Sequence, residues 1–224
     1  MTKEIKNLML ILCGVVLGSF LLYKFVFTAN TPAISLPSPS LIATNPSTPL
    51  ILNIASPHSF SVGPENAKVT VVEFFDPECE SCSAVAPQIK NEMKYYDGKV
   101  RWVFRYMAYH FNSKTAIQVL EAARKQNLFL ETQQILFESQ RIWGEQRVST
   151  EKEILKIVSG IKKINMAQLK KDMQDPEIIN IIEKDATAGK QAGVTGTPTF
   201  YVNGEILDRL DLDLLIQKIN AGLN

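Results

Sequence analysis

The sequence is poor in the residues from which disulfide-stapled mini-proteins and histidine-rich metal sites are built. Its 224 residues include three cysteines and two histidines, too few for either architecture. Charge of one sign is also scarce, because 24 Lys and Arg side chains balance 23 Asp and Glu side chains. The resulting net charge of +1 gives no electrostatic reason to expect nucleic acid as a partner. With 46% hydrophobic residues and a mean hydropathy of zero, the composition excludes a disordered chain and a polytopic membrane protein.

One long uncharged stretch is present, Leu8–Tyr23, and Lys3 and Lys6 precede it. It reaches the ~20 residues that a membrane helix needs if the Lys24 side chain extends toward the interface. We therefore expect residues 1–27 to form an N-terminal membrane anchor with a cytoplasmic N-terminus. The rest of the protein is then exported.

A cleaved signal peptide is the alternative to an anchor, and it too would export the body of the protein. The large aromatic Phe27, two positions before Ala29, fits poorly with a cleavage site there. Cys13 follows Leu12 rather than a small residue. We interpret it as a small apolar side chain of the membrane helix rather than a lipid-modified cysteine.

A proline-rich segment follows the anchor. Residues 28–64 contain seven of the eleven prolines, separated by Ser, Thr and Asn, which is typical of a semi-extended linker. We predict a linker over residues 28–60 and a globular domain over 61–224. The apolar stretch Leu50–Ile54 could already pack against that domain.

The rest of the chain alternates between strand and helix patterns. Residues 68–75 and 99–107 are predicted strands on either side of a helix that begins near Cys79 and contains Pro87. Helical spacing then dominates residues 113–189. A strand over 199–202, an Asn-Gly hairpin turn at 203–204, a strand over 205–207 and a helix over 210–223 complete the pattern. This order predicts an α/β protein with the thioredoxin fold and a helical insertion over about 113–190.

Cys79 and Cys82 have CxxC spacing at the predicted start of a helix. Unpaired backbone N–H groups and the helix dipole stabilise a thiolate there. Such a thiolate can attack a disulfide, and a second cysteine one turn along the helix can resolve the mixed disulfide. Half of a zinc site, completed by His58, His110, Cys13 or a second copy, is an alternative, as is an inert disulfide. The pattern favours redox catalysis.

Three separated motifs resemble the DsbA-like thiol-disulfide oxidoreductases of the thioredoxin superfamily. Residues 73–82 (EFFDPECESC), with Pro87 after them, resemble that family's active-site segment, residues 100–105 (VRWVFR) its next strand, and residues 193–204 (GVTGTPTFYVNG) its cis-proline loop and hairpin. The resemblance extends from about Val62 to the C-terminus. Three motifs in the correct order are more specific than a CxxC pair alone.

The resemblance implies a role for each matching residue. It makes Cys79 the nucleophile, Cys82 the resolving cysteine and Glu73 an acidic group that moves protons to and from Cys82. It also implies a cis bond between Thr197 and Pro198, which would expose the Thr197 backbone to an extended substrate. A salt-bridged structural Glu73 and an ordinary trans proline are the alternatives.

The expected activity is disulfide exchange without a cofactor or a metal. Expected partners are exported cysteine-containing proteins and a membrane or soluble redox partner that recycles the cysteine pair. The expected location is a bacterial cell envelope, with an inner-membrane anchor and the domain on the extracytoplasmic side. Oxidation, reduction and isomerisation all remain open. The alternative function is a thioredoxin-fold binding module, either a folding helper or a copper or zinc carrier that uses both cysteines as ligands.

The sequence departs from the strongly oxidising members, which usually carry Pro-His between the cysteines. Here the pair is Glu80-Ser81, and with Asp76 and Glu78 it places three carboxylates and no cation near Cys79 in the sequence. Negative charge disfavours a thiolate, so the sequence predicts a disulfide that is less oxidising than in those members.

We interpret the remaining histidines, tryptophans and charged residues as structural or surface residues. His58 and His110 are interpreted as surface or structural residues, and Trp102 and Trp143 as core. The charges over residues 162–185 are interpreted as solvated helix faces.

Overall fold

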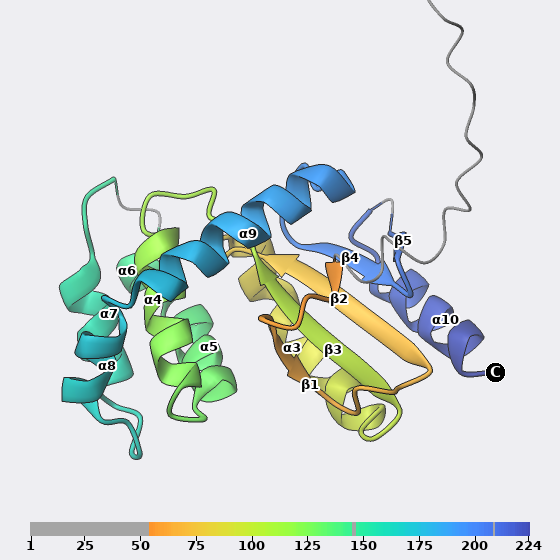
Figure 1. Ribbon diagram of the computed structural model, residues 1–224, viewed down its shortest axis with the longest axis horizontal. Coiled ribbons are helices and arrows are strands. Elements are labelled where there is room, and N and C mark those ends of the chain that lie inside the picture. The colour runs from red at the N-terminus through yellow and green to blue at the C-terminus, as the bar shows by residue number, and fades with distance from the viewer. Residues whose placement is uncertain (1–53, 145–146, 208) are drawn as a thin grey trace, which may run out of the picture. The chain divides into compact units, whose positions relative to one another are not determined.

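The computed structural model describes residues 54–144, 147–207 and 209–224 (Figure 1). The strands are β1 (Phe60–Val62), β2 (Val69–Phe75), β3 (Val100–Tyr106), β4 (Thr199–Val202) and β5 (Glu205–Ile206). The helices are α3 (Glu80–Tyr95), α4 (Ser113–Arg124), α5 (Phe129–Glu138), α6 (Gln140–Trp143), α7 (Glu151–Val158), α8 (Met166–Asp172), α9 (Pro176–Ala192) and α10 (Leu212–Leu223).

These elements form a sheet with the strand order β1-β3-β2-β4-β5. Strands β2 and β3 are parallel, and the other pairs are antiparallel. Asn203 and Gly204 both have positive φ, 50° and 87°, as the predicted hairpin turn between β4 and β5 requires. The short strand β1 was not predicted, because three residues carry too little pattern to be recognised.

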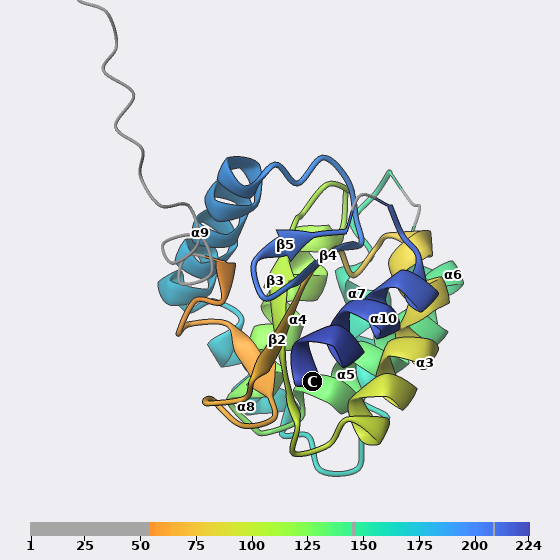
Figure 2. The same ribbon diagram turned by 90° about the vertical axis from the view of Figure 1, so that its right-hand side faces the viewer.

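Helices cover both faces of the sheet, with α3 and α10 on one side and α9 on the other (Figure 2). Side chains of β2 alternate between these faces. Phe75 and Val71 belong to the larger core, which contains buried residues of α3 and α10, whereas Val72 and Phe74 belong to a smaller core beside α9. Since Glu73 lies between Val72 and Phe74, its side chain faces the α3 side.

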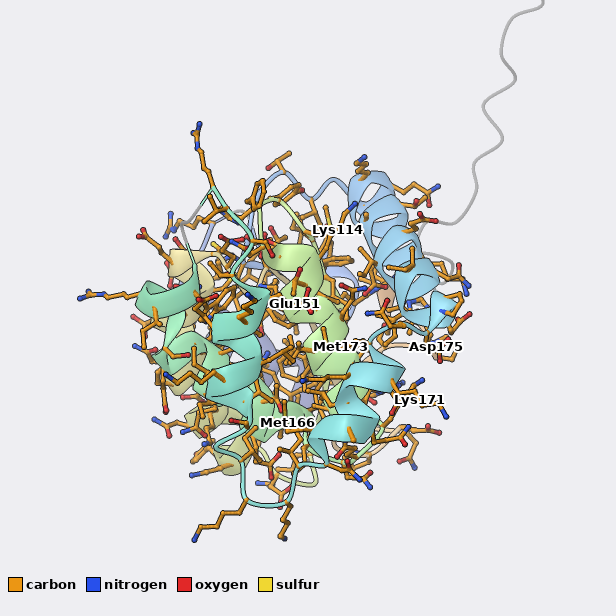
Figure 3. All side chains as sticks on the ribbon, turned by 90° about the vertical axis from the view of Figure 1, so that its left-hand side faces the viewer. Lys114, Glu151, Met166, Lys171, Met173 and Asp175 are labelled. Carbon is orange, nitrogen blue, oxygen red and sulfur yellow. The ribbon has the colours of Figure 1, made fainter. Side chains whose placement is uncertain are left out.

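The helical insertion predicted over about 113–190 is confirmed. Helices α4 to α8 lie between β3 and β4 in the chain, and α9 returns from them to the sheet (Figure 1). Figure 3 looks onto this insertion, with α7 and α8 in front of α4 and with Met173 labelled where α8 ends. Trp143 is fully buried in the insertion and Trp102 is 2% exposed in the sheet, which confirms both as core residues. The α/β thioredoxin fold with a helical insertion is therefore confirmed.

The domain begins before the predicted boundary at residue 61. Ile54 is 1% exposed and packs in the smaller core, and its carbonyl oxygen accepts a hydrogen bond from Arg105 Nη1 at 3.1 Å. The predicted linker over 28–60 therefore extends too far, because apolar burial fixes its last residues to the domain. The predicted anchor over 1–27, with Cys13, lies outside the described residues. In the part of the chain that is described, no helix is long and apolar enough to cross a membrane.

One charged residue was wrongly interpreted as solvated. Asp185 of α9 is fully buried and binds Arg105 of β3, whose Nε and Nη2 donate to Asp185 Oδ1 at 2.8 and 2.6 Å. The backbone N–H of Tyr106 donates to the other carboxylate oxygen at 3.0 Å. Helical periodicity alone did not distinguish this inward carboxylate from its exposed neighbours.

Candidate active site

The CxxC pair lies where α3 begins. Cys79 is the N-cap residue, with extended backbone, and its N–H donates to the carbonyl oxygen of Asp76 at 3.1 Å. Cys82 is in the first turn of the helix. Cys79 is 9% exposed and Cys82 is completely buried, and both are free thiols. Cys79 therefore keeps a small exposed fraction, whereas Cys82 keeps none.

The two thiols have opposite pKa shifts. A hydrogen bond from the Cys82 thiol is the largest influence on Cys79 and, with a hydrogen bond from Thr197, it outweighs desolvation and lowers the pKa of Cys79 from 9.0 to about 5. Burial raises the pKa of Cys82 far above 9.0, and the charges of Glu73 and Cys79 add to that rise. At neutral pH Cys79 is a thiolate and Cys82 remains a thiol.

Glu73 lies on the sheet face that α3 covers, in register with Phe104 of β3 and Phe200 of β4. It is 6% exposed, and burial raises the pKa of its carboxyl from 4.5 to about 8. Its charge raises the pKa of Cys82, so the two groups interact through the core. A carboxyl with a pKa near neutrality can both hold and release a proton beside the buried thiol.

The loop before β4 completes the site. The Thr197–Pro198 peptide bond is cis, as expected, and Cys79 Sγ, in its thiol form, donates to the carbonyl oxygen of Thr197 at 3.3 Å. The antiparallel pairing of β4 with β2 brings this loop beside the start of α3. A pocket of about 240 Å³ adjoins Pro198 and is lined also by Thr199, Ile206 and Leu210.

Two of the three acidic residues next to the cysteines point inward. Asp76 and Glu78 are 0% and 2% exposed. The backbone N–H groups of Glu78 and Tyr109 donate to Asp76 at 2.9 and 2.8 Å, and that of Asn112 donates to Glu78. These carboxylates join the turn before α3 to the loop after β3. Only Glu80 of the three is exposed.

Two polar residues from distant parts of the sequence also contact this turn. The amide nitrogen of Gln140, in α6, donates to the carbonyl oxygens of Pro77 and Cys79 at 2.9 and 3.1 Å. His110, in the loop after β3, places its Nδ1 2.8 Å from Asp76 Oδ2. Both contacts hold the backbone that carries Cys79.

The thioredoxin family model matches residues 55–221. A probable disulfide bond formation protein D of Bacillus anthracis is 32% identical over 176 residues, which cover 73% of this chain and 77% of that protein. The crystal structure of oxidised BdbD from Bacillus subtilis aligns with a TM-score of 0.64 at 27% identity, covering 73% of this chain and 91% of BdbD. This chain belongs to the DsbA-like thiol-disulfide oxidoreductases of the thioredoxin superfamily.

Other relatives of this DsbA-like chain are much longer proteins. A Na(+)/H(+) antiporter NhaA of Herminiimonas arsenicoxydans is 27% identical over 145 residues. The match covers 65% of this chain, which spans about a fifth (22%) of that antiporter's length.

The structure of this DsbA-like protein brings together Cys79, Cys82, Glu73, Thr197 and Pro198. The contacts of Gln140 and His110 with this turn were not predicted, because neither residue has a local pattern that signals contact with a distant turn. The sequence places no cation near Cys79, whereas in the structure the charge of Cys79 acts on His110. Among the described residues, no group of three or more His, Cys, Asp and Glu side chains is arranged to hold a metal.

Proposed function

We propose that this protein exchanges disulfides with exported cysteine-containing proteins through Cys79 and Cys82. The observation that carries the proposal is the contrast between the two sulfurs. Cys79 is partly exposed with its pKa lowered to about 5, and Cys82 is buried with its pKa raised. An accessible thiolate above a protected thiol is the arrangement that two-step disulfide exchange needs.

The exchange runs through a mixed disulfide. When the protein oxidises a substrate, a substrate thiolate attacks Cys79 Sγ in the Cys79–Cys82 disulfide, and the Cys82 thiolate leaves and takes a proton from Glu73. A second substrate thiolate then attacks the substrate sulfur of the mixed disulfide and releases the Cys79 thiolate. The substrate loses two electrons and gains a disulfide, and the protein becomes the dithiol. Reduction is the reverse sequence.

The contacts of Cys79 support oxidation of substrates as the preferred direction. The lowered pKa of Cys79 stabilises the dithiol form, which makes the disulfide a better oxidant. This argues against the milder oxidant inferred from the three neighbouring carboxylates, since two of them are buried among hydrogen-bond donors. Equilibration with glutathione tests the direction: we expect the disulfide to be more oxidising than that of thioredoxin. A more reducing disulfide would contradict it.

Thr197 and Pro198 are proposed to bind the substrate backbone beside its reacting cysteine. The support is the contact between Cys79 Sγ and the Thr197 carbonyl oxygen, which places that segment within reach of anything bonded to Cys79. An extended substrate can pair with an exposed backbone segment in this way.

An extracytoplasmic location in a bacterium is part of the proposal, and so is a redox partner that recycles the cysteine pair. The uncharged stretch Leu8–Tyr23 after Lys3 and Lys6 supports an inner-membrane anchor with the domain outside the cytoplasm. Fractionation of cells and N-terminal sequencing of the membrane-bound protein test this. A soluble protein that begins after residue 27 would contradict the anchor.

Trapping of mixed disulfides tests the activity. In cells that make Cys82→Ser, with free thiols blocked, we expect high-mass species on non-reducing gels that disappear on reduction. The matched control is Cys79→Ser combined with Cys82→Ser, which should give none. Folded Cys82→Ser without such species would contradict the proposal and favour the binding module, and the trapped proteins would identify the substrates.

A further inference from the structure

His110 lies outside the CxxC motif but is tied to it through one carboxylate. Its Nδ1 is 2.8 Å from Asp76 Oδ2, and its backbone N–H donates to the same oxygen at 3.3 Å. The Asp76 carboxylate accepts a hydrogen bond from the N–H of Glu78. The Asp76 carbonyl oxygen accepts one from the N–H of Cys79. The ring is thus held against the turn that carries the Cys79 sulfur.

The ring can change its charge in this place. Its side chain is 46% exposed, so protons reach it from solvent, whereas Asp76 is fully buried. Partial burial opposes the imidazolium, but the hydrogen bond and charge of Asp76 outweigh it, and the pKa of His110 is raised above 6.5.

Besides Asp76, the titratable groups whose charges act on the ring are Glu78 and Cys79. The charges of Glu78 and Cys79 raise the pKa of His110, and the pKa of Tyr109 is itself raised, by burial and by Asp76. Interaction between two charged groups is reciprocal. A Cys79 thiolate that favours the imidazolium is therefore favoured by it.

We propose that His110 is a positioning residue whose imidazolium, held by Asp76, stabilises the Cys79 thiolate from outside the CxxC motif. It supplies the positive charge that Glu80 and Ser81, between the cysteines, do not. The inference rests on the proposed role of Cys79 and adds a pH dependence to it: the stabilisation is present while His110 is protonated and fades as the ring loses its proton.

His110→Asn is the variant that isolates the charge, because the Asn amide nitrogen can take the place of Nδ1 and keep the hydrogen bond to Asp76. His58→Gln is the matched control. His58 also binds a buried carboxylate, with Nε2 2.7 Å from Asp185 Oδ1, and a Gln amide reaches the position of Nε2. The control residue belongs to the N-terminal segment of the domain rather than to the site.

In the reduced full-length protein, the pH dependence of thiolate absorbance reports the pKa of Cys79 directly. We expect His110→Asn to raise it by about one unit, the lower end of the effect of a neighbouring opposite charge. His58→Gln should leave it unchanged. An unchanged pKa in His110→Asn, or an equal rise in His58→Gln, would overturn the inference.

The equilibrium of the protein disulfide with two glutathione thiols, which gives the protein dithiol and glutathione disulfide, provides a second readout. A rise in the pKa of Cys79 from about 5 to about 6 corresponds to about a fivefold change at about pH 6, where imidazole is charged. The change is in the direction of a weaker oxidant for His110→Asn. The difference should disappear near about pH 9. A difference that persists there would mean a structural role only.

A measurement on the unmodified protein guards against a variant that fails to fold. The sequence contains two histidines, so NMR can follow both rings. We expect the pKa of His110 to be higher in the dithiol form than in the disulfide form. Equal values for His110 would overturn the inference. None of these pKa measurements requires turnover, so they separate the failure of this inference from the failure of the proposed exchange activity.

Discussion

At the scale of single residues, the contact between the two sulfurs controls the reactivity of Cys79. The hydrogen bond from Cys82 is the largest cause of its lowered pKa. We expect Cys82→Ala to raise the pKa of Cys79 by at least about one unit and Cys82→Ser, which keeps a donor, to raise it less. The pH dependence of alkylation by iodoacetamide measures both. The same midpoint in Cys82→Ala and the wild type would contradict the assignment.

Glu73 makes a contribution to the stability of the reduced protein that falls as the pH rises. Its carboxyl pKa is raised from 4.5 to about 8 in the fold, so the unfolded chain loses this proton first. The contribution of Glu73 is complete below pH 4.5 and is lost as the pH rises to about 8. Glu73→Gln lacks the titration. The free energy of unfolding of the wild type minus that of Glu73→Gln should therefore fall by on the order of 5 kcal/mol across this range.

Subtracting the variant is essential, because Cys79 acts in the opposite direction. Its pKa is lowered from 9.0 to about 5, so it adds stability as the pH rises between those values. Urea unfolding of both reduced proteins at a series of pH values measures the difference. If that difference stays constant with pH, Glu73 does not titrate in the fold as described.

At the scale of elements, a buried ion pair fixes α9 to β3. Asp185 is fully buried and Arg105 is 1% exposed, and Asp185 also accepts from the Tyr106 backbone. Asp185→Asn leaves the guanidinium in the core without its counter-charge, so we expect the protein to lose about 3–5 kcal/mol of stability. Glu183→Gln, at an exposed position of the same helix, should change it by less than about 0.5 kcal/mol. Chemical denaturation compares them, and equal stabilities would contradict the role of the pair.

The same pair illustrates what sequence can and cannot predict. Local sequence patterns were sufficient to predict β2, β3, β4 and α3, because the residues of each element have their own pattern and are bounded by turn residues. The placement of the cysteines at a helix start followed from the same signals. Asp185 was misjudged because it acquires its role from Arg105, a residue far away in sequence. His110 was interpreted as a surface or structural residue, and its contact with Asp76 agrees with that. Contacts between residues that are far apart in the sequence produce no local periodicity, so a sequence pattern does not reveal them.

At the scale of the whole molecule, two large apolar side chains are exposed on elements next to the CxxC turn. Phe111 is 63% exposed in the loop that binds Asp76 and Glu78, and Ile142 is 62% exposed in α6, the helix whose Gln140 holds the Cys79 carbonyl. Both lie on segments in contact with the CxxC turn. Exposed apolar side chains can form a binding surface, and we expect an unfolded polypeptide substrate to contact these two.

If these side chains bind protein substrates, their loss should affect protein substrates and small thiols differently. Replacing both Phe111 and Ile142 with Ser should lower kcat/KM for a reduced, unfolded protein about tenfold, because partial burial of two such side chains is worth at least about 1.4 kcal/mol. The rate with glutathione, which needs only Cys79, should stay the same. Tyr95→Ser is the control, since Tyr95 is 74% exposed at the opposite end of α3. If both substrates slow equally, the side chains support the fold of the site and do not bind the substrate chain.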